Sequence, residues 1–462
     1  MYNTIKIALI FLVWSLANSS IKAQRNVFWI HGNGSTVYPW NYLESNLIWN
    51  GANGTYKLNT ISGTGYPIFN TKNGVTASYD PNYGKGFVED FVDKNPSSLF
   101  AVPAGNQPTI AICHSMGGLM MRNYDLNPNY AKIGGIITVG SPLRGAHIAN
   151  SFMDGSVKSF IDNGSYLMTR AINNDFNPVT WLVQELNDVN TQLNKFNYGT
   201  FSQSAGGFTS PRTVADLAEN SSTTSTIYKD ANHSATSTPK LSIYGNESSP
   251  VFWRLIGSGQ EKGPNMGEIT KNDLSTYFET QRDIAYGSYI IGVGLVSDVI
   301  SWFNGNSSFF IGSEYNDALN WVNWDSENGW LNVDGANTFT AENCINYRCI
   351  DDYAHYYGCA NQYPNNTGAR EACQSPYFHT CHVCSVSPVN YKTDGLIVAT
   401  SAIGFNTPSW ANAESPQEAL GVNHLDLTPK LYSDGSDPLG KMSAVFHTIF
   451  DKTTSSFYTP SK

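Results

Sequence analysis

The chain is long enough for one large domain with long insertions, or for two or three domains, since it has 462 residues of which 41% are hydrophobic. Its formal net charge is −10 at pH 7, and it has no basic run that could neutralise phosphate groups, which argues against nucleic acid as a partner. No segment reaches about 18 uninterrupted apolar residues, so no transmembrane helix is predicted.

The first 23 residues have the layout of a secretory signal peptide. Lys6 is followed by an apolar run from Ile7 to Trp14 and then by small residues up to Ala23. The sequence therefore predicts an exported protein, secreted or periplasmic, whose mature chain begins near residue 24.

Residues 24–150 are expected to form the first part of an α/β core. Three short runs are apolar on both faces and end at turn residues: Asn26–Ile30, Thr109–Cys113 and Ile133–Val139. Such runs are typical of parallel strands that helices cover on both sides. Gly117–Leu126 can form the helix that joins the second run to the third. This order predicts an α/β fold with a mostly parallel central sheet.

Two long excursions interrupt this core. Residues 151–238 show little periodicity and are expected to form a cap insertion. A core strand is expected at 239–246, then a second insertion over 247–390, and the second part of the core over 391–462. Within the second insertion, Tyr289–Phe303 is apolar over much of its circumference. Two interpretations of it stay open, a buried helix and a lid that opens on lipid.

Six of the seven cysteines fall in the segment 344–384. In an oxidising compartment such a cluster is typical of disulfide bonds, and six cysteines allow many pairings. Zinc binding is the alternative, because a CxxC pair lies close to His355, His379 and His382. The single CxxC pair and the export signal favour disulfides, with the connectivity open. The candidates are Cys344, Cys349, Cys359, Cys373, Cys381 and Cys384.

The segment Ile112–Gly118 (ICHSMGG) carries the strongest functional signal. An apolar strand runs into a serine and then into a helix, which is the pattern of a nucleophile elbow. The residues two before and two after the serine must be small. Gly117 meets this requirement, whereas Cys113 replaces the usual glycine. The helix start also brings N–H groups near a developing oxyanion, so Ser115 is the candidate nucleophile.

Acyl transfer needs two N–H donors directed at the tetrahedral oxygen. One usually comes from the residue after the nucleophile and one from the loop after the first strand, here His31–Gly34. Met116 and Asn33 are the predicted donors. His31 is interpreted as a structural histidine that fixes this loop through hydrogen bonds.

The acid and the base should follow the nucleophile in the order Asp, His. Asp394 lies on a turn in TDGLIV, and His424 lies in VNHLD 30 residues later, which suits one strand, a connecting segment and a loop. The other later histidines lie before this acid, in the cysteine-rich segment, or in the C-terminal amphipathic segment. The predicted catalytic residues are therefore Ser115, Asp394 and His424.

At these motifs the chain resembles the bacterial triacylglycerol lipases of the α/β-hydrolase superfamily, and more loosely the inositol-deacylase-like lipases. The resemblance covers core strands and leaves both excursions unmatched. It implies an α/β-hydrolase fold, a triad completed by Asp394 and His424, and an active-site neighbour in Ser141–Gly145. The matching segments are HGNG (31–34), CHSMGGL (113–119), TVGSPLRGA (138–146), TDGLIV (393–398) and NHLD (423–426).

The resemblance also suggests a structural calcium site. Some of those lipases hold calcium through the aspartate two residues after the histidine, here Asp426, but the glutamine expected four residues further on is Lys430. A surface carboxylate that caps a loop is the alternative role of Asp426. The triad chemistry itself requires no cofactor.

Together these features predict an exported serine hydrolase that cleaves carboxylic esters, with a lipid-like ester as substrate and transient contact with a lipid interface. An amidase, thioesterase or acyltransferase would use the same triad, and the fold does not decide between them. A catalytically weak hydrolase-fold protein that binds ligands through its aromatic-rich excursions is the alternative from another class.

Overall fold

The chain divides into two compact units, Met1–Ala336 with Lys392–Lys462, and Asn337–Tyr391. The predicted signal peptide lies outside the described residues. The computed structural model describes residues 25–32, 38–43, 58–60, 107–125, 133–173, 184, 187–189, 191, 211–219, 221, 237–290, 308–350, 359, 362, 367–374, 378–404 and 412–459.

A six-stranded sheet forms the core of the first unit, in the order β2-β1-β3-β4-β5-β8. Every neighbouring pair is parallel. All residues of β4 are buried, and this confirms the prediction of parallel strands from runs that are apolar on both faces. The strands are β1 (Arg25–Ile30), β2 (Leu58–Thr60), β3 (Gln107–His114), β4 (Gly135–Val139), β5 (Lys240–Asn246) and β8 (Gln417–Leu420).

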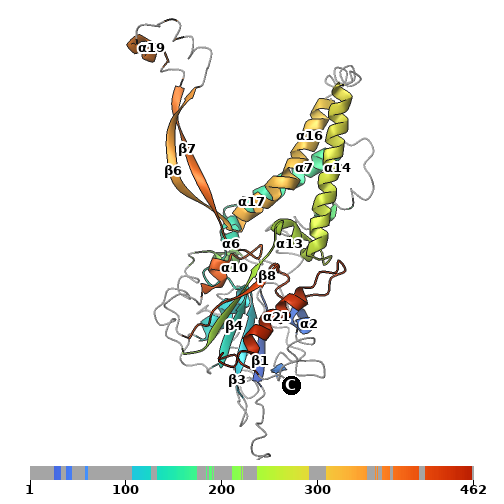
Figure 1. The fold of residues 1–462 in the computed structure, drawn as a ribbon, viewed down its shortest axis with the longest axis vertical. Helices are drawn as coiled ribbons and strands as arrows, with labels where there is room; N and C mark the ends of the chain where they lie inside the picture. Colours follow the sequence, from blue (N-terminus) through green and yellow to red (C-terminus); the bar gives the residue numbers. More distant parts are fainter. Residues whose placement is uncertain are drawn as a thin grey trace, which may run out of the picture. The chain divides into compact units, whose positions relative to one another are not determined.

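Two hydrophobic clusters lie on the two faces of this sheet. In β3, Ala111 and Cys113 contribute to one cluster, whereas Ile110 and Ile112 contribute to the other, because successive side chains of a strand point to opposite faces. Helices thus cover both faces, as the α/β prediction requires. The covering helices are α5 (Met116–Asp125) on the first cluster, and α2 (Tyr38–Leu43) and α21 (Pro438–Phe450), red in Figure 1, on the second.

Helical segments follow β4 and β5 in the chain. α16 packs against both α7 and α14 (Figure 1). Within the described ranges, no helix is long and apolar enough to cross a membrane. Most of Tyr289–Phe303 lies outside those ranges. The helices are α6 (His147–Met153), α7 (Ser156–Asn173), α10 (Pro211–Leu217), α13 (Val251–Gly259), α14 (Pro264–Ile290), α16 (Ser308–Asn320), the π-helix Trp321–Asp325, and α17 (Ser326–Val333).

An aromatic cluster connects these helices to the core of the sheet. The Phe252 ring lies 5.3 Å from Phe160, 6.0 Å from Trp321 and 5.4 Å from Trp330, measured between ring centroids. All four residues belong to the same cluster as Ala111 and Cys113 of β3 or pack against it. Because buried aromatic rings bring large apolar areas into contact, α7, α13 and α17 are packed firmly together.

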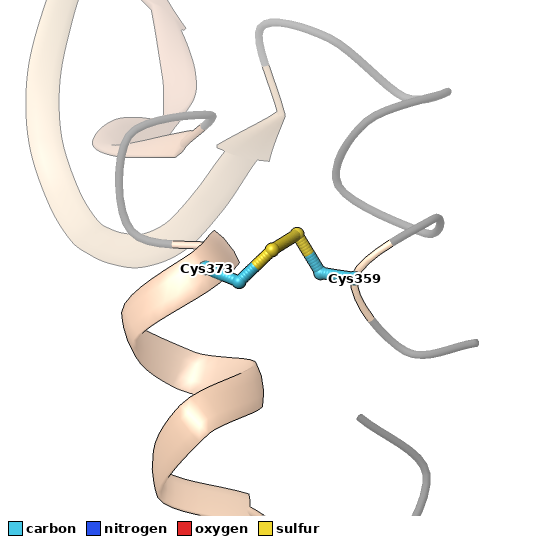
Figure 2. The surroundings of a disulfide bond; sticks show 2 residues. All are labelled: Cys359 and Cys373. Atoms are coloured by element: carbon cyan, nitrogen blue, oxygen red, sulfur yellow. A yellow bond between two sulfur atoms is a disulfide. The ribbon is translucent and has the colours of Figure 1, made fainter. Parts of the chain in front are cut away.

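The second unit contains a two-stranded antiparallel ribbon, β6 (Asn337–Ile350) with β7 (Phe378–Asn390). Cys359 and Cys373, the latter on α19 (Thr367–Gln374), form a disulfide with an S–S distance of 2.06 Å (Figure 2). This confirms two of the six disulfide candidates. The other four lie on β6 and β7, where the backbone of Cys344 pairs with that of Cys384, and their side chains lie outside the described part of the chain.

Candidate active site

Ser115 lies on a sharp turn between β3 and α5. Its φ of +54° is in the left-handed region, and its N–H donates to the carbonyl of Val139 at 2.9 Å. A Cβ on Gly117 would lie 2.7 Å from the carbonyl oxygen of His31, so a larger residue would collide with backbone there. This is the geometry of a nucleophile elbow, in which strain exposes the serine hydroxyl.

Cys113 takes the place of the glycine usual two residues before the serine. Its side chain is fully buried on the face of β3 that carries Ala111, and burial raises the pKa of its thiol well above the usual value. The thiol is therefore protonated and acts as a small apolar group. The elbow accepts this substitution because the side chain points into the core and away from Ser115.

His424 lies between Ser115 and Asp394. Its Nε2 is 3.0 Å from Ser115 Oγ, and its Nδ1 is 2.8 Å from Asp394 Oδ2. A tautomer with Nδ1–H donates to the carboxylate and leaves the Nε2 lone pair for the serine hydroxyl. The structure thus brings together the three residues that the sequence predicts, and β8 is the strand between Asp394 and His424.

The Asp394 carboxylate is fixed in one orientation. Its Oδ1 accepts the N–H groups of Leu396 at 3.0 Å and Ile397 at 2.7 Å, so Oδ2 is the atom that faces His424. The N–H of His424 also donates to the carbonyl of Asp394 at 2.8 Å. The side chain of Asp394 is 1% exposed and that of His424 is 6% exposed. The hydrogen bond between His424 Nδ1 and Asp394 Oδ2 is therefore largely shielded from water.

His114, next to Ser115, also contacts His424, which the sequence analysis missed. Its Nε2 lies 3.1 Å from the carbonyl of His424, and the two rings have centroids 4.7 Å apart. Burial, and then the neighbouring His424, lower the pKa of His114 well below its usual value. The neutral ring donates Nε2–H to that carbonyl and supports the loop that carries His424. In the sequence, the position of His114 next to Ser115 is the one feature that could have indicated this contact.

Gly140, directly after β4, leaves space for the pair formed by Asp394 and His424. Its φ is +56°, and a Cβ there would lie 3.0 Å from Asp394 Oδ2 and 3.2 Å from His424 Nδ1. Any side chain would therefore push against both residues. The loop that follows includes Ser141, which is buried with its Oγ 3.4 Å from the carbonyl of Cys113. The segment predicted to lie beside the active site, 141–145, therefore extends one residue further back, to Gly140.

Of the two predicted oxyanion donors, Met116 is described and Asn33 lies outside the described residues. α5 begins at Met116. The first N–H groups of a helix have no acceptor within it, so the Met116 N–H can serve an anion. A Cβ on Gly32 would lie 2.7 Å from Ser115 Cβ, which places the start of the loop after β1 directly against Ser115. His31 is buried and its Nδ1 contacts the carbonyl of Gly32 at 2.8 Å.

Asp426 is buried, so its interpretation as a surface carboxylate is wrong. Its carboxylate accepts hydrogen bonds from Ser258 Oγ at 3.1 Å, Asn423 Nδ2 at 2.9 Å and Tyr432 OH at 2.5 Å. The segment that carries Tyr432 and helix α13, which carries Ser258, cover the loop after His424. Tertiary packing that the sequence does not reveal therefore buries the charge.

These residues do not fit a calcium ion. Calcium takes about six to eight oxygen ligands, whereas both oxygens of Asp426 already accept hydrogen bonds from neighbouring donors. Lys430, in place of the expected glutamine, lies 3.8 Å from Glu261 and supplies a cation where a ligand would be needed. Among the described residues, no group of three or more His, Cys, Asp or Glu side chains could hold a metal ion.

The burial of Asp426 predicts a pH effect on stability. Burial raises its pKa to about 6. Because the folded state then binds the proton more tightly than the unfolded state, Asp426 stabilises the fold at low pH, and this contribution is lost as the pH rises through 6. Relative to Asp426→Asn, the wild type should lose about 2 kcal/mol of unfolding free energy between pH 4.5 and 7.5. Denaturant unfolding of the wild type and of Asp426→Asn at both pH values measures this loss. The same pH dependence of the unfolding free energy in both proteins would contradict the prediction.

The parallel sheet, the elbow at Ser115 and the chain order Ser, Asp, His define an α/β-hydrolase fold. No family model and no curated protein matches the chain. Among solved structures, the chain is similar to a peroxisomal α/β-hydrolase from Saccharomyces cerevisiae, with 14% identity over 48% of this chain and 63% of that one and a TM-score of 0.26. The chain therefore spans less than two thirds of that structure.

Two further solved structures show similar relationships. A soluble variant of monoglyceride lipase from Saccharomyces cerevisiae is 17% identical over 50% of this chain and 70% of its own, with a TM-score of 0.25. A putative aryl esterase from Burkholderia cenocepacia is 13% identical over 49% and 73%, with a TM-score of 0.24. Similarities at this level do not bear on the activity of this chain, which has to be inferred from the site itself.

Proposed function

We propose that the protein is a serine hydrolase that cleaves carboxylic esters, with Ser115 as nucleophile, His424 as base and Asp394 as the acid that orients it. The observation that carries this proposal is the continuous chain of contacts, 3.0 Å from Ser115 to His424 and 2.8 Å from His424 to Asp394. Serine becomes nucleophilic only when such a base takes its proton, and surface serines lack this arrangement.

In the proposed mechanism, His424 Nε2 takes the proton of Ser115 as Oγ attacks the ester carbonyl. The N–H of Met116, with a second donor from Asn33, stabilises the negative oxygen. The imidazolium, stabilised by Asp394, then gives its proton to the departing alcohol, and an acyl-serine remains. Water, deprotonated by His424, attacks this acyl-serine, and the free acid and Ser115 are regenerated.

A lipid-like ester is the proposed substrate, and an exported location the proposed site of action. The substrate proposal rests on the likeness of the segments around Ser115, Asp394 and His424 to those of triacylglycerol lipases. The signal-peptide layout of residues 1–23 and the Cys359–Cys373 disulfide support export, since disulfides persist in oxidising compartments.

Hydrolysis of a p-nitrophenyl ester series, from short to long acyl chains, tests the reaction and the substrate class. We expect turnover by the purified mature protein, and a long-chain optimum if the substrate is a lipid. A short-chain optimum would favour a carboxylesterase. A parallel assay with an alcohol acceptor and a p-nitroanilide would detect acyl transfer or amide cleavage. Absence of turnover across all of these compounds would contradict the proposal and favour a binding role.

A further inference from the structure

We propose that Trp330 and Asp334, at the C-terminal end of α17, are positioning residues that hold the turn carrying Asp394 and thereby keep its carboxylate on His424. This inference rests on the proposed function. It makes α17, which belongs to the second insertion, a support of the active site, although no residue of α17 is expected to touch the substrate.

The end of α17 contacts the turn on both sides of Asp394. On one side, Thr393 Oγ1 donates to Asp334 Oδ2 at 2.9 Å. On the other, Trp330 Nε1 donates to the carbonyl of Gly395 at 2.8 Å. The residue between these two anchors is Asp394 itself, so its backbone is held at both ends.

Two more hydrogen bonds tighten the same turn. The N–H of Gly395 donates to Thr393 Oγ1 at 2.9 Å, so the Thr393 hydroxyl receives one bond and gives the other to Asp334. The second oxygen of Asp334 accepts the N–H of Ala336 at 2.8 Å. Each hydroxyl and carboxylate oxygen of this arrangement thus has a defined partner, which fixes the rotamers of Thr393 and Asp334.

These contacts are made inside the protein. Trp330 and Asp334 are fully buried, and Thr393 is 4% exposed. Hydrogen bonds in such a low-dielectric environment are stronger than bonds at the surface, and a partner left without its bond is costly. The network therefore resists displacement of the turn.

α17 is itself held rigidly. The Trp330 ring packs 5.7 Å from Phe160 and 5.4 Å from Phe252, and Ser151 Oγ on α6 donates to the carbonyl of Val333 at 2.9 Å. A turn anchored to a packed helix is positioned more exactly than a free loop, and a catalytic group must be held to within a fraction of an ångström.

Asp334 also adds charge near the triad. Burial, together with the nearby charges of Asp394 and Glu327, raises the pKa of Asp334 to about 7. His147 also interacts electrostatically with Asp334. Near neutral pH Asp334 is therefore partly ionised beside Asp394.

Three variants test the anchors in the full-length mature protein. Thr393→Val removes the hydroxyl that connects Asp334 to the turn, and Thr393→Ser restores it. Trp330→Phe removes the indole N–H but keeps an aromatic ring. Thr238→Val is the matched control, because the buried Thr238 hydroxyl also donates to a carboxylate, that of Asp125, but lies just before β5 and makes no contact with the turn among the described hydrogen bonds. Trp321→Phe controls for the loss of indole volume in the same cluster.

We expect Thr393→Val to lower kcat by roughly 10- to 100-fold with KM changed by less than about three-fold, since a small misplacement of a catalytic group can cost about 10²-fold. Thr393→Ser should recover most of this loss. Trp330→Phe should lower kcat by about 10-fold, and both controls should stay within about two-fold.

A readout without substrate separates this inference from the proposed function. The proton shared between His424 Nδ1 and Asp394 should give a far-downfield proton NMR signal, which should broaden or shift in Thr393→Val and Trp330→Phe and persist in the controls. If the wild type hydrolyses no ester but this pattern holds, the proposed function fails and the positioning role stands. The positioning role would be overturned if Thr393→Val and Trp330→Phe both kept the kcat and the NMR signal of the wild type. Equal losses in the control variants would also overturn it.

Discussion

Ser115→Ala is expected to lower kcat for ester hydrolysis by roughly 10⁶-fold while leaving the fold intact. In the proposed mechanism the Ser115 hydroxyl forms the acyl-enzyme, and its Oγ lies 3.0 Å from His424 Nε2, the proposed base. Alanine adopts the left-handed backbone of this position, φ +54°, no less readily than serine, so the turn and its strain are retained. Only oxyanion stabilisation and binding remain to accelerate hydrolysis.

Single-turnover kinetics and covalent labelling by a fluorophosphonate measure this loss, and the melting temperature checks the fold. Ser165→Ala is a matched control, because the Ser165 hydroxyl on α7 is buried with no hydrogen-bond partner among the described residues. It should keep full activity and labelling. Residual turnover above about 1% in Ser115→Ala would place the nucleophile elsewhere.

Asp394→Asn is expected to lower kcat by about 10⁴-fold without unfolding the protein. The oxygen that accepts from Leu396 and Ile397 must stay an oxygen, because both of these partners are N–H donors. The new NH₂ group is therefore forced to face His424 Nδ1. It can donate only to an unprotonated Nδ1, so the ring proton moves to Nε2, and the base loses the lone pair that takes the proton of Ser115.

The pre-steady-state acylation rate across pH is the measurement for this variant. Asp154→Asn is the control, because Asp154 Oδ1 also accepts an N–H two residues on, from Ser156 at 2.8 Å, but lies at the start of α7. It should leave kcat unchanged. A loss below ten-fold in Asp394→Asn would mean that the carboxylate does not set the tautomer of His424, and the role proposed for Asp394 would then be wrong.

The parallel sheet and the elbow could be predicted from local pattern. Strands such as β3 and β4 are short and apolar on both faces, a property of the residues themselves that needs no knowledge of the partner strand. The order of Ser115, Asp394 and His424 follows from a chemistry with few solutions, and the structure places these three side chains in contact. The pairing of Cys359 with Cys373 was one of many options, because connectivity depends on which chains meet in space.

What only the tertiary structure decided is how the surroundings of the triad are built. The contact of Asp334 with Thr393 joins residues 59 positions apart, and that of Ser258 with Asp426 joins residues 168 apart. The second insertion, which supplies Asp334, shows no motif in the sequence. A buried aspartate also cannot be distinguished from a surface aspartate by sequence alone. By itself the sequence indicated strands β1, β3, β4 and β5, the serine turn and the candidate catalytic residues, because these follow from local periodicity and reaction chemistry. The burial of Asp426, the contact of His114 with His424 and the support from α17 depend on long-range packing, which no local pattern encodes.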